Sequence, residues 1–163
     1  MTSKNVRRSA VALALVAFGA VSAQAQTATQ TVAFQVNAIN QIAFTGSPSL
    51  TITTAVAGSA PTSVTDASAS WAVTSNQSSA KITASIPTAM PTGLTLSSNL
   101  TAPTGGTSAG FLALSATAVD LVTGITKIAQ GSLGVSYKLD ATAAAGVVAS
   151  STRIVTYTIT GGT

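Results

Sequence analysis

The sequence predicts an all-β protein: a two-sheet antiparallel β-sandwich, immunoglobulin-like or pilin-like, with about eight strands. Short segments alternate apolar and polar residues, which is the period of a half-buried strand. Turn clusters of Gly, Pro, Asn and Ser recur at intervals of roughly 8–12 residues. After residue 25, no apolar pattern has the 3.6-residue period of an amphipathic helix. Long Pro/Gly-rich connections and medium-sized aliphatic residues at inward positions favour a sandwich over a closed barrel.

The longest alternating stretch covers residues 31–45, TVAFQVNAINQIAFT. Its large apolar residues share one parity and its polar residues mostly share the other. The apolar set is Val32, Phe34, Val36, Ile42 and Phe44. We expect one long strand here, which is either the first strand of the domain or a strand offered to a neighbouring molecule.

Other segments follow the same pattern. Further strands are expected at residues 50–53, 70–74, 81–86, 94–101, 132–140 and 153–160. Trp71 and Ile82 are expected to lie on the inner face of one hairpin, closed by a polar turn at residues 75–79. Loops or irregular structure are expected at residues 55–68, 102–110 and 123–131.

Two stretches leave alternatives open. Residues 111–122 are apolar on both parities, so they form either a doubly buried strand or a strand followed by a turn. Residues 141–145 could form a short helix, which Gly146 would end.

Residues 1–25 have the three parts of a secretory signal peptide. Lys4, Arg7 and Arg8 form the positive start, and an apolar core too short for a stable membrane anchor follows at residues 10–20. Ala23-Gln24-Ala25 matches a cleavage site, so we expect a mature chain of one domain over residues 26–163. The alternative is an uncleaved membrane helix. The leader is of bacterial type and predicts a secreted, cell-surface or periplasmic protein with no integral membrane segment after its removal.

The composition excludes several classes of function. The 163 residues are 46% hydrophobic and only 6% charged, against about 25% charged in typical soluble domains. After the signal peptide, the chain has four basic and three acidic residues, which gives a net charge of +1. These residues are Lys81, Lys127, Lys138 and Arg153 against Asp66, Asp120 and Asp140. Because the basic residues are scattered, no patch that could neutralise nucleic-acid phosphates is expected.

The chain offers little for catalysis. It contains no His, Cys or Glu, so the usual general bases, thiolate nucleophiles and zinc ligands are missing. The three aspartates are widely spaced and read as turn or strand-end residues. Ser78-Ser79-Ala80-Lys81 matches an S-x-x-K pattern, but it precedes a strand and lacks its partner motifs. We therefore expect that this protein is not an enzyme and binds neither a metal nor a cofactor.

Three aromatic residues have two interpretations. Trp71, Tyr137 and Tyr157 lie on the apolar parity of their strands, which indicates core positions. Alternatively, exposed rings at these positions could stack on the sugars of a polysaccharide.

The signal peptide, the all-β body without charge clusters and the terminal run RIVTYTIT resemble secreted bacterial surface β-sandwich proteins. Pilin-like chaperone–usher subunits and the spore-coat-U-like group share this style, and VTDASASWAVTSNQ resembles the Trp-bearing part of WxL-type cell-wall domains. Chaperone–usher pilins usually carry a disulfide, whereas this chain has no cysteine; Val155-Thr156-Tyr157 stands where WxL domains carry a second Trp motif. No functional residue is carried over from these families.

Two kinds of function are consistent with these sequence features. The first is a non-enzymatic structural protein, a fibre or coat subunit that associates with itself or with other surface proteins by strand addition through residues 26–45. The second is an extracellular module that binds a polysaccharide or a surface protein. The first depends on the long N-terminal stretch, and the second on an exposed aromatic ring.

Overall fold

The computed structural model describes residues 24–162 and confirms the predicted β-sandwich. The described chain forms nine strands and one short 3₁₀ helix, η1. They are β1 (Asn40–Thr45), β2 (Val64–Ser75), β3 (Ala80–Ser85), β4 (Leu94–Leu100), β5 (Thr107–Ser108), β6 (Leu112–Ala113), β7 (Val119–Ile125), β8 (Ile128–Ala141), η1 (Ala143–Ala145) and β9 (Thr156–Thr160). The predicted signal peptide lies almost entirely outside the described residues, so its prediction stands untested.

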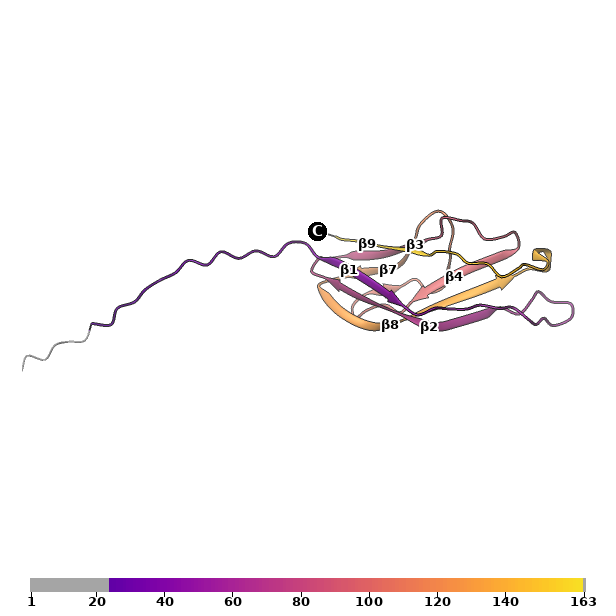
Figure 1. The fold of residues 1–163 in the computed structure, drawn as a ribbon, viewed down its shortest axis with the longest axis horizontal. Coiled ribbons are helices and arrows are strands. Elements are labelled where there is room, and N and C mark those ends of the chain that lie inside the picture. Colours follow the sequence, from indigo (N-terminus) through magenta and orange to yellow (C-terminus); the bar gives the residue numbers. More distant parts are fainter. Residues whose placement is uncertain (1–23, 163) are drawn as a thin grey trace, which may run out of the picture. The chain divides into compact units, whose positions relative to one another are not determined.

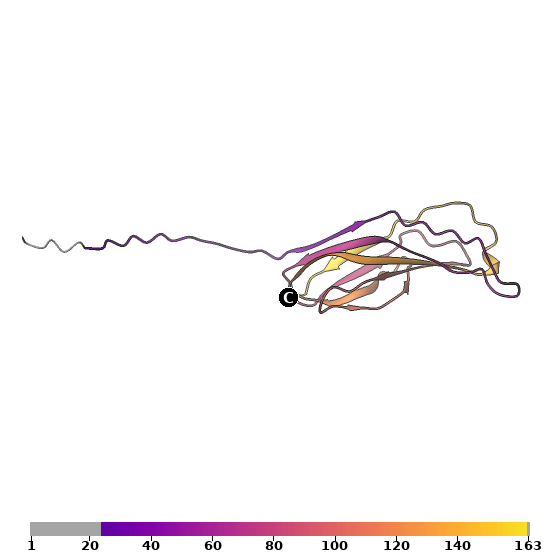
Figure 2. The ribbon, with the colours of Figure 1, turned by 90° about the horizontal axis from the view of Figure 1, so that it is seen from below.

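The strands form two antiparallel sheets that pack face to face. The first sheet has the order β1-β2-β8-β4-β6 and the second has the order β5-β7-β3-β9. Figure 1 shows β3, β7 and β9 in one layer and β2 and β8 in the other, and Figure 2 shows the two layers from a second direction. The sandwich belongs to a compact unit that begins at Val36.

Inward-facing residues of both sheets build one core. The strict alternation of buried and half-buried residues along β3 shows how the two-residue period directs one face inward. The buried apolar residues are Ala69, Trp71, Val73, Ala80, Ile82, Ala84, Ile86, Leu96, Leu100, Leu114, Leu121, Val122, Ile125, Leu133 and Val135. The predicted core role of Trp71 is therefore confirmed.

The predicted hairpin between Trp71 and Ile82 is wrong. Trp71 lies on β2 in the first sheet, whereas Ile82 lies on β3 in the second, so the chain crosses between layers after Ser75. The second crossing, between β7 and β8, lies beside it: the Lys127 amide donates to the Gln77 carbonyl at 2.9 Å. A period of two identifies the buried face of a strand but not its neighbour in the sheet.

Residues 50–53 form no strand, contrary to the prediction. The β1–β2 ladder ends at the pair Thr45–Ser70, and Gly46 then takes a φ of 104° directly against Ala69. Downstream, the Ser49 amide donates to the Asp66 carboxylate at 2.8 Å rather than to a strand carbonyl. Leu50 and Ile52 nevertheless stay half-buried, so the alternation is real although the pairing is absent.

Several other boundaries differ from the expected ones. The predicted loop at residues 55–68 overlaps β2, which begins at Val64, and the region 123–131 contains the end of β7 and the start of β8. Residues 111–122 resolve into β6, a turn and the start of β7, which supports the strand-plus-turn alternative. Of the short helix predicted at residues 141–145, only Ala143–Ala145 is present, as η1, because Ala141 is the last residue of β8. Gly146, with a φ of 62°, follows η1 as expected.

The predicted long strand at residues 31–45 is wrong in its first part. β1 covers only Asn40–Thr45 and pairs with β2 in its own domain. Residues 24–39 form neither helix nor strand. Among the described residues, no helix has the length and apolarity needed to span a bilayer.

Candidate functional site

The structure divides the five apolar residues of the predicted long strand into two groups. Ile42 and Phe44 lie on β1 and pack against the core, opposite Val73 and Trp71 of β2. Val32, Phe34 and Val36 lie before β1, and their side chains are 72%, 94% and 78% exposed. We call residues 26–36 the N-terminal segment.

Three exposed apolar side chains at alternate positions are a notable feature of this segment. Isolated exposed apolar residues are common, but these three share one parity and would all lie on the same face of a strand. Pairing with a sheet edge would satisfy the backbone and turn that face toward apolar neighbours.

Asn76 anchors the chain where the N-terminal segment ends. Its side-chain amide donates to the Asn37 carbonyl at 2.7 Å, and its side-chain oxygen accepts from the Ile39 amide at 2.8 Å. Its own main-chain amide donates to the Ile39 carbonyl at 3.2 Å. Three bonds from one residue therefore fix residues 37–39 to the turn after β2, and the ladder of β1 continues from there.

Phe44, Trp71 and Tyr157 form an aromatic cluster between β1, β2 and β9. The Phe44 ring stacks on Tyr157 with 4.0 Å between centroids, and its centroid lies 6.0 Å from that of Trp71. Trp71 is only 2% exposed, and its indole N–H donates to the Thr101 carbonyl at 3.2 Å. Trp71 therefore presents no open ring face to a sugar. Phe44 joins β1 to β9 across the two sheets, a role that the alternation of residues 31–45 alone does not reveal.

Tyr137 and Tyr157 are half-buried, and their hydroxyls form a short chain of hydrogen bonds. The Tyr157 hydroxyl donates to Tyr137 at 2.8 Å and lies 2.9 Å from the hydroxyl of Ser98, which is fully buried. Burial raises the pKa of both tyrosines above 10.0, and for Tyr157 donation to Tyr137 raises the pKa further. The chain is built from neutral hydroxyls and links the two sheets.

From these hydroxyl hydrogen bonds we predict that the folded protein loses stability in alkaline solution. Because the folded state raises the pKa of Tyr157, its stabilising effect is complete below pH 10 and declines as the pH rises above it. We expect Tyr157→Phe to lower the free energy of unfolding by about 1–3 kcal/mol at pH 7, since buried Ser98 loses its partner. The variant should also lose less stability than the wild type between about pH 9 and 11, a range that brackets the reference pKa of tyrosine. Denaturant titrations followed by circular dichroism measure both effects, and equal pH slopes in the two proteins would refute the assignment.

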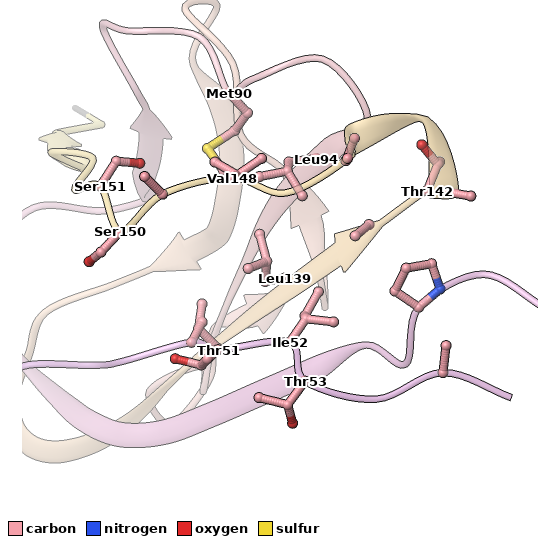
Figure 3. A pocket seen from close by; sticks show the side chains of 18 of the residues that line it. Thr51, Ile52, Thr53, Met90, Leu94, Leu139, Thr142, Val148, Ser150 and Ser151 are labelled. Atoms are coloured by element: carbon pink, nitrogen blue, oxygen red, sulfur yellow. The ribbon is translucent and has the colours of Figure 1, made fainter.

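A cavity of about 590 Å³ lies at the end of the sandwich where β2 begins, and we call it the edge cavity. One flank is the chain that follows β1, at residues 50–55, and the other is the chain that leads to β9, at residues 146–151. Figure 3 shows Ile52 and Leu139 directed into the space between these two flanks. The remaining lining comes from Pro61, Met90, Leu94, Ala141, Thr142, Ala143 and Ala145.

The backbone of both flanks is open for pairing. Within residues 24–162, the main chain at residues 50–53 and 147–151 makes no hydrogen bond. The sequence does not indicate this site, because the alternation at residues 50–53 predicts a paired strand and residues 146–151 carry no pattern. The exposed pair Val147–Val148 directly after Gly146 is the signal that could have indicated it.

Within residues 24–162, the charged side chains do not gather at one site. Lys81 pairs with Asp120 at 3.0 Å and Lys138 with Asp140 at 3.1 Å, both near the surface. Hydrogen bonds from Ser68 and Ser49 lower the pKa of Asp66, as expected for a carboxylate that closes a turn. In the part of the chain that the structure describes, no three His, Cys, Asp or Glu side chains come together to hold a metal.

Comparisons of the chain with protein-family models, with curated proteins and with solved structures found no match. The family resemblances that the sequence suggests therefore stay predictions.

Proposed function

We propose that this protein is an exported structural subunit, part of a surface fibre or coat, that assembles by adding its N-terminal segment as a β-strand to another molecule. The observation that carries the proposal is the exposure of Val32, Phe34 and Val36 at alternate positions in a segment that forms no strand. The two sheets pack around a core whose buried residues all come later in the chain.

The energetics make assembly through these side chains feasible. Burial of one Val or Phe side chain contributes about 1.5–3 kcal/mol, so three contribute roughly 5–9 kcal/mol. Association itself costs about 4–15 kcal/mol. Main-chain hydrogen bonds add about 0.5–1.5 kcal/mol each, so apolar burial and strand pairing are both needed for a stable contact.

The composition is compatible with close packing of identical copies. The segment of residues 26–36 contains no charged residue, and the domain from residue 26 onward carries a net charge of +1. Repulsion between copies is therefore weak. Both β1 and β9 are edge strands, so each sheet has a free edge at which a strand can add.

Replacing Val32, Phe34 and Val36 together with serine is expected to abolish assembly of the protein that begins at Gln26. The change removes the roughly 5–9 kcal/mol of apolar burial while leaving the backbone able to pair. Negative-stain microscopy and size-exclusion chromatography measure the outcome. A matched control carries Thr31→Ser and Ala33→Ser on the opposite parity and should assemble like the wild type.

Filaments of undiminished length from the triple serine variant would refute this function. A wild-type protein that stays monomeric at high concentration, with the same elution as the triple variant, would also refute it and favour a monomeric binding module.

A further inference from the structure

We propose that the edge cavity is the acceptor site of assembly, and that it receives residues 30–36 of a second copy of this chain. The inference rests on the proposed function, because it names the site at which the N-terminal segment would bind. Each flank of the cavity would pair with one edge of the incoming strand, and the large apolar side chains of the strand would face the floor.

The flanks supply the backbone groups that an added strand needs. Residues 50–53 and 148–151 line opposite sides of the cavity, and neither stretch uses its main chain in a hydrogen bond within the described chain. A ligand without a peptide backbone would leave most of these main-chain N–H and C=O groups hydrogen-bonded only to water. An extended polypeptide satisfies both sides at once, which is how a strand binds between two edges.

The floor suits an apolar, uncharged strand. Leu50, Ile52 and Val148 of the flanks and Met90, Leu94 and Leu139 of the floor contribute apolar side chains, and no charged residue among residues 24–162 lines the cavity. The N-terminal segment is likewise uncharged, and its apolar residues alternate with Ala33 and Gln35, which would point outward. The two surfaces therefore match in polarity and in charge.

The other edge of the sandwich offers no such site. It is formed by β5 and β6, which have two residues each. Behind them, Leu121, Val122 and Leu100 are completely buried, whereas Tyr157 and Ile159 on β9 are only partly buried. Apolar core surface is therefore left open on the β1–β9 side and covered on the other.

The position of Val36 indicates that the donor is another molecule. Asn76 holds the neighbouring Asn37 just beyond Ser75, the last residue of β2. The cavity lies at the opposite end of β2, because Leu139 pairs with Val64, the first residue. Twelve residues of strand separate these ends by on the order of 30 Å, so Val36 cannot enter the cavity of its own chain. A donor and an acceptor at different places on each copy generate an open chain of subunits.

Disulfide trapping tests the assignment, because the chain has no cysteine of its own. Donor variants carry Val32→Cys, Phe34→Cys or Val36→Cys, and acceptor variants carry Ile52→Cys or Leu139→Cys. Each donor is mixed with each acceptor under mild oxidation, and non-reducing gels with peptide mass spectrometry identify the pairs. We expect at least one donor to form about tenfold more mixed dimer with an acceptor than Ala33→Cys does, since a disulfide needs Cβ atoms that face each other.

A second control separates this inference from the proposed function. Ala113→Cys places an exposed thiol on β6 at the other edge of the first sheet. The cavity is not the acceptor if filaments form but the donors link equally well to Ala113→Cys. The same holds if filaments form but no donor links to Ile52→Cys or Leu139→Cys. In either case, assembly by strand addition would still stand. Failure of the wild type to assemble would instead overturn the proposed function.

Discussion

Replacement of Trp71 by alanine is expected to lower the free energy of unfolding by about 3–5 kcal/mol, the range measured for buried aromatic residues. Trp71 is 2% exposed, lies opposite Phe44 and Leu133 in the first sheet, and donates its indole N–H to Thr101. A single domain is stable by only about 5–15 kcal/mol, so the variant should lose roughly a fifth or more of its stability. Denaturant unfolding followed by far-ultraviolet circular dichroism measures the change.

Trp71→Phe is the matched variant for this prediction. It keeps an aromatic ring beside Phe44 but loses the indole hydrogen bond and some volume, so we expect a smaller loss, about 1–2 kcal/mol. Equal stability of the alanine variant and the wild type would contradict the central position of Trp71. An alanine variant no less stable than Trp71→Phe would show that the ring itself contributes nothing.

Truncation at two positions is expected to give opposite results. A protein that begins at Asn37 lacks the N-terminal segment but keeps the Asn76 anchor and β1, so it should keep the wild-type free energy of unfolding within about 0.5 kcal/mol. A protein that begins at Gly46 lacks β1 and with it Ile42 and Phe44, and should fail to form the sandwich. The loss combines roughly 3–6 kcal/mol of apolar burial with the hydrogen bonds of the β1–β2 ladder.

The two truncations also separate folding from assembly. The protein that begins at Asn37 should be a folded monomer by circular dichroism and size-exclusion chromatography. Extensive unfolding of that protein would contradict the view that the sandwich is complete without the N-terminal segment. Native-like spectra from the protein that begins at Gly46 would show that β1 is dispensable and that Phe44 does not support the aromatic cluster.

Some strands could be predicted from the sequence and others could not. β3, β4 and β8 follow clear alternation, and the structure buries the predicted parity along β3 and at Leu133 and Val135 of β8. On β4 it buries Leu96 and Leu100 as predicted, but also Ser97 of the opposite parity. Residues 50–53 show the same alternation but form no strand. The chain turns away from β2 at Gly46, and the Ser49 amide donates a hydrogen bond to the Asp66 carboxylate instead of to a strand. Local pattern reports which face of a segment is buried, and it does not report whether a partner lies alongside.

The candidate site shows the same division. The apolar parity of Val32, Phe34 and Val36 could be read directly from residues 31–45. The exposure of these side chains could not, because it depends on where pairing to β2 begins. The edge cavity depends on three separate parts of the chain, residues 50–61, 90–94 and 139–151, and no local signal connects them.

The sequence by itself determined the two-residue period of the strands, the low charge and the lack of the residue types that common enzymes use. These properties follow from residue identity and local order. Only the tertiary structure decided that β2 and β3 belong to different sheets, that β1 ends at Thr45 and that the flanks of the edge cavity stay unpaired. The physical reason is that hydrogen bonding between strands joins residues far apart in the chain, and an alternating segment presents the same backbone to every neighbour it could pair with.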